Sequence, residues 1–294
     1  MTDPVQQLKA LQRNNDFLIG IDSDGCAFDS MEIKHKECFC PNFIRYFGLQ
    51  AVSKYARETW EFVNLYSKTR GYNRFKAVVV ALDLLRERTV VQERGVEIPK
   101  MQGLREWIHR ETKLGNPALE AELAHNPDPD LQLAYEWSTS VNKSVEDIVF
   151  NLPPFPYLKK SLQKIQGKAE VIVVSQTPLE ALQREWKEHD IDGYLDLIAG
   201  QEMGTKTEHL AFAAEGKYPS QHILMIGDAP GDLKAAEANG ALFYPIVPGK
   251  EEQSWRRFFE EGLERFLNER YEGEYAKKLA VEFDASLPEK PDWS

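Results

Sequence analysis

In the segment Phe17–Ser30, FLIGIDSDGCAFDS, an apolar run leads into two acids spaced two residues apart. Alternate side chains of a strand point to the same face, so Asp22 and Asp24 would share one side of the chain where the strand passes into a loop. Two neighbouring carboxylates repel each other unless a cation, a shared proton or solvent offsets their charge. The simpler interpretation is an acidic turn after a strand, because Asp and Gly are common turn residues.

The composition is that of an ordinary globular protein of 294 residues with a net charge of -11, long enough for two domains or one elaborated domain. The negative charge disfavours a general nucleic-acid or anionic-membrane surface, since phosphate groups select basic faces. No apolar run approaches the roughly 20 residues that cross a bilayer, and residues 1–16 lack the apolar core of a signal peptide. We therefore expect a cytoplasmic protein without a nucleic-acid or membrane partner.

The three cysteines, Cys26, Cys38 and Cys40, lie close together without a second cluster of Cys or His at zinc-like spacing. Four zinc ligands cannot be assembled from these neighbours, so we expect free thiols. Cys26 adjoins the two acids, but no histidine lies nearby in the sequence to activate it as a nucleophile.

Five short apolar runs predict buried parallel strands, namely residues 17–22, 171–175, 195–200, 223–228 and 241–247. Helical patterns separate the last four runs; one begins at Pro178 and another ends at Asn239 and Gly240, a common helix stop. This alternation predicts right-handed crossovers and an α/β fold with a Rossmann-like, doubly wound sheet of five parallel strands. Ligands of such sheets bind at the carboxyl ends of the strands.

The interval between the first two predicted strands has a different pattern. Residues 31–153 contain no convincing strand, and their apolar residues recur at helical spacing, which predicts an inserted all-helical domain. The proline-rich segment NLPPFPYL, residues 151–158, predicts the return hinge. The α/β domain would then comprise residues 1–30 and 154–294, with an amphipathic helical extension from about residue 250.

Polar residues follow four of the predicted strands, at the carboxyl ends that meet at one edge of the sheet. In chain order they are Asp22 and Asp24, then Ser175 with Gln176 and Thr177, then Lys206, then Asp228 and Asp232. Acids supply the oxygen ligands that Mg²⁺ prefers, while a lysine and a hydroxyl bind anionic oxygens. Each residue alone has an ordinary explanation, such as a helix N-cap at Ser175 or a solvated Lys206. Their joint occurrence predicts one site for phosphate and magnesium.

Four motifs follow one another in the chain: DSDG with FDS, an apolar run ending in Ser175, then Lys206, then IGDAPGD. This order resembles the haloacid dehalogenase-like (HAD) hydrolase superfamily, whose four motifs fall at these strand ends. The helical insert is similar to the mobile cap of that superfamily, and the overall plan is similar to the branch containing phosphoglycolate phosphatase, beta-phosphoglucomutase and phosphonatase. The resemblance implies a magnesium-dependent phosphatase that acts on a small phosphorylated metabolite. The oligomeric state stays open between monomer and homodimer. The sequence departs from the common family residues at Cys26 and Thr207, both next to motif residues.

For the reaction itself, the resemblance implies that Asp22 attacks phosphorus and forms an aspartyl-phosphate. Asp24 would protonate the leaving oxygen and then activate water. Mg²⁺ would be held by Asp22, the backbone carbonyl of Asp24, and Asp228.

The remaining motif residues would bind the transferring phosphoryl group. The resemblance implies this task for Ser175, Gln176 and Lys206, with backbone amides near Gly25 as further donors. Asp232 would orient Lys206 or a water molecule.

Three other functions are weighed against this one. A phosphomutase of the beta-phosphoglucomutase type would use the same core with a cap that excludes water, and it stays open as the alternative. A catalytically silent phospho-ligand-binding protein is disfavoured because the four motif residues are all present, namely Asp22, Asp24, Lys206 and Asp228. Dehalogenases and phosphonatases of the superfamily lack the second acid of the first motif. This chain has that acid, Asp24, so these two activities are disfavoured.

The insert contains a basic segment, Tyr66–Lys76, YSKTRGYNRFK, with Gly71 at its centre. A glycine there permits a tight bend between two helices. The ordinary interpretation is a solvated basic turn, because Lys and Arg are mostly exposed. The functional interpretation is that Arg70 or Arg74 contacts an anionic group of the substrate through its planar guanidinium.

Overall fold

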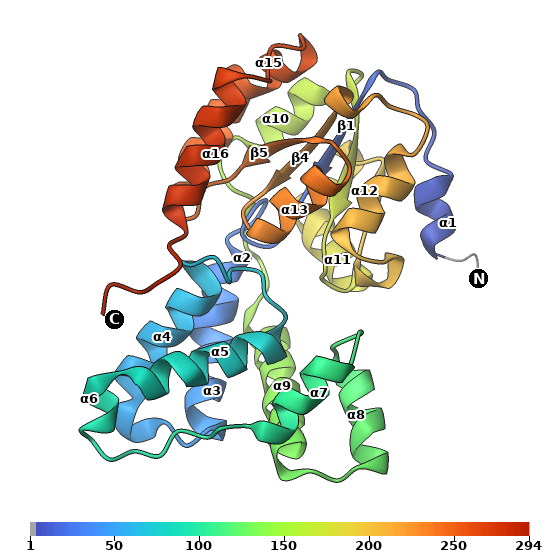
Figure 1. The fold of residues 1–294 in the computed structure, drawn as a ribbon. Helices are drawn as coiled ribbons and strands as arrows, with labels where there is room; N and C mark the ends of the chain where they lie inside the picture. Colours follow the sequence, from blue (N-terminus) through green and yellow to red (C-terminus); the bar gives the residue numbers. More distant parts are fainter. Residues whose placement is uncertain (1–3, 294) are drawn as a thin grey trace. The chain divides into compact units, whose positions relative to one another are not determined.

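The computed structural model describes residues 4–293, which divide into two compact units (Figure 1). The core unit consists of residues 4–31 and 151–287, and the helical unit consists of residues 32–150 and 288–293. This division differs from the sequence expectation at the C-terminus, because the last residues group with the helical unit. The chain therefore passes between the units at residues 31–32, 150–151 and 287–288.

The core unit contains a sheet of five parallel strands, which confirms the predicted fold class. The strands are β1 (Phe17–Ile21), β2 (Ala169–Val174), β3 (Leu197–Ala199), β4 (Ile223–Gly227) and β5 (Leu242–Pro245), arranged in the order β3-β2-β1-β4-β5. In the register of the sheet, Ile21 pairs with Val173 of β2 and with Ile226 of β4. The chain order reverses at the central strand β1, so the carboxyl ends of β2, β1 and β4 are adjacent at the point where such sheets bind ligands.

Helices cover both faces of the sheet because alternate strand residues belong to two separate apolar clusters. Leu18, Ile172 and Met225 pack with one set of helices, and Ile19, Val171 and Leu224 pack with the other. The first set is α1 (Pro4–Lys9), α12 (Lys206–Ala214) and α13 (Pro230–Ala238); the second is α10 (Leu158–Ile165), α11 (Leu179–Glu188), α14 (Glu251–Arg257), α15 (Leu263–Leu267) and α16 (Glu274–Ser286) (Figure 1). A π-helical segment, η6 (Phe258–Gly262), joins α14 to α15, and short 3₁₀ turns lie at η3 (Asp192–Tyr194), η4 (Gln201–Met203) and η5 (Ser220–His222).

The helical unit contains helices and no strand over its described residues. Its elements are η1 (Lys34–Phe39), a π-helix that follows the linking helix α2 (Ser30–Ile33), then α3 (Cys40–Tyr46), η2 (Gln50–Val52), α4 (Ser53–Leu65), α5 (Arg74–Glu87), α6 (Thr89–Gln92), α7 (Gln102–Arg110), α8 (Asn116–His125) and α9 (Pro129–Ile148). The unit has its own aromatic core, in which Trp60 and Trp137 are fully buried and pack edge to face at 5.9 Å. Across residues 4–293, no helix combines the length and the apolar character needed to cross a membrane.

The C-terminal residues belong to the helical unit because Trp293 packs on its surface. The Trp293 ring lies 4.4 Å from the guanidinium of Arg88 and meets the Phe62 ring edge to face at 5.4 Å. The Lys68 amide also donates to the carbonyl oxygen of Pro288 at 3.3 Å. A stacked cation and a ring contact hold this short tail in place without secondary structure of its own.

Candidate active site

The residues predicted for the site follow the carboxyl ends of three adjacent strands. Asp22 follows β1, Ser175 follows β2 and Asp228 follows β4. The neighbouring strands fix two of them, since the Asp22 amide donates to Ile226 O at 3.0 Å and the Ser175 amide donates to Ala199 O at 3.1 Å. All three side chains are buried, so the polar groups of this edge interact with each other more strongly than they would in water.

Lys206, the first residue of α12, joins two of the acids. Its Nζ lies 2.8 Å from Asp22 Oδ2 and 2.7 Å from Asp232 Oδ1. Asp232 Oδ2 accepts from the amides of Asp228 at 3.2 Å and Ala229 at 3.0 Å. Both oxygens of Asp232 are therefore engaged, and the role that this geometry fits is to hold Lys206 and the loop after β4.

Gly227 is a necessary part of this arrangement that the sequence pattern did not single out. A Cβ atom at Gly227 would lie 2.3 Å from the Cβ of Asp232, far inside van der Waals contact. Only glycine lets the Asp232 side chain fold back against the end of β4. Gly227 is part of the motif IGDAPGD, but glycine is needed there because of the close approach of Asp232, which the motif alone does not reveal.

Burial and charge set the protonation of Asp22 and Lys206. Burial raises the pKa of Asp22 well above its ordinary value; Lys206 opposes this shift, and the charges of Asp232 and Asp228 add to it. Burial lowers the pKa of Lys206, but Asp22 and Asp232 outweigh that effect, so the pKa stays above its ordinary value. Lys206 is thus a fixed cation, and a divalent cation beside the acids would favour the ionised form of Asp22.

Three carboxylates form a set that fits a divalent cation. One oxygen each from Asp22, Asp228 and Asp232 lies within 4.8 Å of the others. All three donors are hard carboxylate oxygens, a set that suits Mg²⁺ better than metals that prefer nitrogen or sulfur. Asp232 accepts from Lys206 and from two amides, whereas Asp22 accepts from Lys206 and from the Ser23 amide, so Asp232 is less suited than Asp22 to bind a metal.

The second acid of the first motif, Asp24, is held by two hydroxyl groups. Ser30 donates through Oγ to Asp24 Oδ1, and Thr177 donates through Oγ1 to Asp24 Oδ2 at 2.8 Å. Gly25 makes the turn that follows, with φ at +75°, a conformation that favours glycine. The Gly25 amide donates to Phe28 O at 2.8 Å, so this donor is used inside the loop.

The other predicted phosphate-binding residues have contacts around the same loops. The Ser175 Oγ accepts from the Thr177 amide at 3.2 Å. The Gln176 side chain donates through Nε2 to Gly204 O at 2.9 Å, which joins the loop after β2 to the loop before Lys206. Gln176 is exposed, whereas Ser175 is buried.

Cys26 adjoins the site but has the properties of a structural thiol. Its Sγ donates to Ile226 O at 3.6 Å, and the residue is fully buried. Burial raises the pKa of Cys26 well above its ordinary value, and the nearby acids Asp228 and Asp22 raise it further. The thiol therefore stays protonated and is a poor nucleophile.

The two arginines predicted to bind substrate lie in the helical unit and are not a solvated basic turn. Arg70 is only 3% exposed and donates through Nη1 to Leu65 O at 2.9 Å. Arg74 donates through Nη1 to Ser138 Oγ at 3.0 Å and to Asn142 Oδ1 at 2.6 Å. Its guanidinium lies 5.0 Å from the Phe39 ring, and burial lowers the pKa of Arg74 to about 10. No carboxylate among residues 4–293 forms an ion pair with Arg74.

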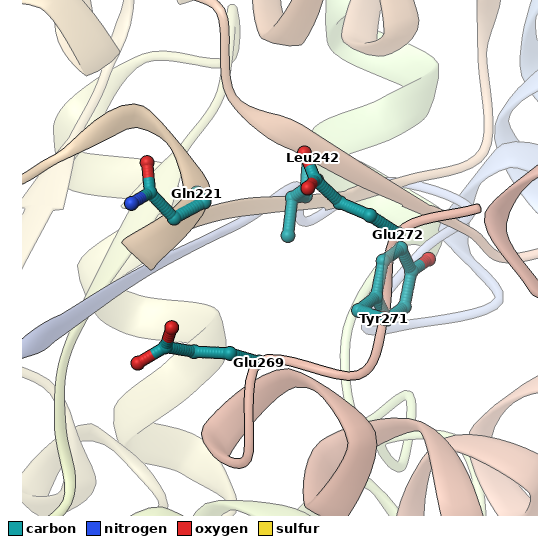
Figure 2. A pocket seen from close by; sticks show the side chains of 5 residues that line it. All are labelled: Gln221, Leu242, Glu269, Tyr271 and Glu272. Atoms are coloured by element: carbon teal, nitrogen blue, oxygen red, sulfur yellow. The ribbon is translucent and has the colours of Figure 1, made fainter.

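A pocket elsewhere in the core unit is lined by the five side chains that Figure 2 shows. Gln221 comes just before β4, and Leu242 is the first residue of β5, so the pocket is at the amino ends of these strands. Its other lining residues are Glu269, Tyr271 and Glu272. These residues include no cation, and they are not part of the site at the carboxyl ends.

Comparisons with known proteins identify similar solved structures only, since no family model and no curated protein matches the chain. Among solved structures, 88 chains match. A haloacid dehalogenase-like family hydrolase from Streptococcus pneumoniae is 15% identical, with a TM-score of 0.47, over 85% of this chain and 98% of its own. A HAD-superfamily hydrolase of subfamily IA from Geobacter sulfurreducens is 15% identical, with a TM-score of 0.41, over 81% and 91%. A predicted phosphatase from Clostridium acetobutylicum is 14% identical, with a TM-score of 0.44, over 85% and 100%.

At these identities the matches give no information on the reaction of this chain, which has to be inferred from its own residues. The solved structures named above are similar to this chain; two of them are named as hydrolases of the HAD group, and the third is named as a predicted phosphatase.

Proposed function

We propose that this protein is a magnesium-dependent phosphomonoester hydrolase that acts on a small phosphorylated metabolite. The observation that supports this most is the contact of Lys206 with both Asp22, which follows β1, and Asp232, in the first turn of α13. Phosphoryl transfer to an acid requires a nucleophilic carboxylate, a cation beside it and a hydrogen-bond donor for the phosphoryl oxygens. Asp22 and Lys206 can supply the first two, and a buried hydroxyl after the neighbouring strand β2 can supply the third. Ser175 provides that hydroxyl.

In the proposed reaction, an oxygen of Asp22 forms a bond to phosphorus as the bond to the leaving oxygen breaks. Asp24 gives its proton to that leaving oxygen. In the second step Asp24 takes a proton from water, the water oxygen attacks phosphorus, and the bond to Asp22 breaks, which restores both acids and releases inorganic phosphate. Asp24 thus alternates between acid and base, so each cycle begins and ends with the same protonation state.

The surrounding residues bind the phosphoryl oxygens during both steps. Lys206 has three N–H donors, of which two point to Asp22 and Asp232, so one remains for phosphate. The Ser175 hydroxyl is a second donor. Mg²⁺, held by Asp22, the backbone carbonyl of Asp24, and Asp228, would offset the repulsion between the carboxylate and the phosphate.

A phosphate-release screen tests this function directly. The substrates are sugar phosphates, phosphoglycolate, nucleotides and phospholipid headgroups, each with Mg²⁺ and with a chelator. We expect release from at least one substrate with Mg²⁺ and none with the chelator. A folded protein that releases no phosphate from any of them would contradict the proposal.

The same screen distinguishes a phosphomutase, which could use these residues with the helical unit excluding water. A mutase requires a bisphosphorylated activator and conserves total organic phosphate, whereas a phosphatase releases inorganic phosphate. A catalytically silent binding protein would show neither reaction, although it would still bind phosphorylated ligands.

Asp24→Asn tests the proposed acid and base. The variant retains the backbone carbonyl and the side-chain shape, but its amide cannot take a proton from water. We expect phosphate release to fall by about 10²- to 10⁴-fold, the usual contribution of general acid–base catalysis. Aspartyl-phosphate should accumulate, measured by acid quench and mass spectrometry of the peptide that contains Asp22. Unchanged turnover would remove Asp24 from the reaction.

The helical unit is proposed to supply substrate recognition through Arg74. Its guanidinium has neutral partners on one nitrogen and no paired carboxylate, so an anionic group of the substrate would complete its interactions. Arg70 fits this role less well, because it is almost fully buried and its Nη1 is bound to a main-chain carbonyl.

Arg74→Ala is expected to raise the Michaelis constant for the true substrate by about 10- to 100-fold, since hydrogen bonds to charged groups contribute that much. Hydrolysis of a small aryl phosphate, which has no second anionic group, should barely change. Arg74→Lys is the matched control, which keeps the charge without the planar donors. Equal effects on both substrates, or none on either, would mean that Arg74 has a structural role and does not bind the substrate.

A further inference from the structure

Thr177 lies between β2 and α11 and contacts two residues of the proposed site in different ways. Its hydroxyl donates to Asp24 Oδ2 at 2.8 Å, and its amide donates to Ser175 Oγ at 3.2 Å. Its carbonyl accepts from the Gln201 amide at 3.1 Å, so main-chain hydrogen bonds fix the position of the residue. The hydroxyl is therefore the group of Thr177 that acts on Asp24, and its loss would leave the main-chain contacts in place.

The Asp24 carboxylate is held from two parts of the core unit that are far apart in the sequence. Ser30, six residues along the chain at the start of α2 and fully buried, donates to Oδ1, while Thr177 donates to Oδ2. A partly exposed carboxylate rotates readily about χ2. Two donors on two different oxygens favour one orientation of the carboxylate. Both donors are hydroxyl groups, so neither adds a charge beside Asp24.

We propose that Thr177 is a positioning residue whose hydroxyl orients the Asp24 carboxylate for proton transfer. The inference rests on the proposed function, in which Asp24 is the acid and base. A displacement of about 1 Å at a reacting group can cost about 100-fold in rate. With the Thr177 hydroxyl removed, Oδ2 of Asp24 loses its hydrogen bond to the loop after β2, and the carboxylate can turn about the contact of Oδ1 with Ser30.

The test compares Thr177→Val with Thr177→Ser. Valine keeps the branched shape and removes the hydroxyl, whereas serine keeps the hydroxyl and removes the methyl group. We expect Thr177→Val to lower kcat by about 10- to 100-fold with little change in KM. Thr177→Ser should retain activity close to the wild type. Equal losses in the two variants, or full activity in Thr177→Val, would overturn the inference.

A double-mutant cycle separates an effect through Asp24 from a direct effect on phosphate. Coupled residues give non-additive changes, so Thr177→Val should cost little more once Asp24→Asn is present. In a Ser175→Ala background, by contrast, Thr177→Val should cost as much as in the wild type, because only the Thr177 amide contacts Ser175. An equal loss in the Asp24→Asn background would mean that Thr177 does not act through Asp24.

Crystal structures of the two variants test the inference without activity. The Asp24 carboxylate should keep its orientation in Thr177→Ser and turn away from residue 177 in Thr177→Val. A carboxylate that is unmoved in Thr177→Val overturns the positioning role, whatever the reaction. If instead the wild type hydrolyses no phosphomonoester, the proposed function fails, and these structures still decide whether Thr177 orients Asp24.

Discussion

We expect Asp22→Asn to abolish phosphate release while the protein folds normally. Asparagine has nearly the same size as aspartate, so it fits the buried position and can still face Lys206, but its amide is not a nucleophile. Loss of a nucleophile usually costs several orders of magnitude, and we expect kcat to fall by at least about 10⁴-fold. The measurement is single-turnover phosphate release, with the melting temperature as the check on folding.

Asp16→Asn is the matched control for this change. Asp16 comes just before β1, and its side chain is largely exposed in an ion pair with Arg13. The same chemical change at the other end of the strand should leave turnover unaffected, because exposed ion pairs contribute little to the stability of the folded protein. An Asp22→Asn protein that keeps more than about a tenth of the wild-type rate would rule out the covalent mechanism.

We expect Asp228→Ala to raise sharply the Mg²⁺ concentration required for phosphate release. Changes to residues that only support metal ligands already cost about 10- to 100-fold in metal affinity, so loss of a ligand should cost at least 100-fold. The measurement is a Mg²⁺ titration of phosphate release together with calorimetric Mg²⁺ binding. Asp24→Asn is the comparison variant. Residue 24 is proposed to bind Mg²⁺ through its backbone carbonyl, which the substitution leaves unchanged, so the Mg²⁺ requirement of this variant should not change.

The stability of Asp228→Ala should move differently from its activity. Asp228 is one of the charges that raise the pKa of Asp22, so its removal relieves repulsion between buried carboxylates. Without Mg²⁺, the melting temperature should therefore stay the same or rise. An unchanged Mg²⁺ requirement, whatever the stability, would remove Asp228 from the metal site.

The strands could be predicted because they depend on local patterns of apolar residues. The predicted run 17–22 corresponds to β1 and the run 223–228 to β4, since a strand buried on both faces is a continuous apolar segment. β2 begins at Ala169, two residues before the predicted start. The prediction missed this end because Glu170 interrupts the apolar run, although Tyr218 and Asn15 bond its carboxylate and allow it to be buried.

The candidate residues of the site were predictable for the same reason, because each follows a strand that the sequence identifies. The contacts among them were not. The sequence left two roles open for Asp232, and the ion pair with Lys206 depends on how α12 and α13 pack on the sheet. Likewise, the Thr177 hydroxyl reaches Asp24 only because β1 and β2 are neighbours, although 153 residues separate the two in the chain.

Two further features, both in the helical unit, depend on tertiary packing and could not be predicted from local sequence. Arg70 and Arg74 are in a segment whose composition suits a solvated turn, yet Arg74 is bound to α9 through Ser138 and Asn142. Trp293 follows a helical extension of the core unit, yet it packs against Arg88. Hydrophobic periodicity determines which segments form helices and strands, but the partner of an individual side chain depends on residues far away in the sequence that only folding brings within reach.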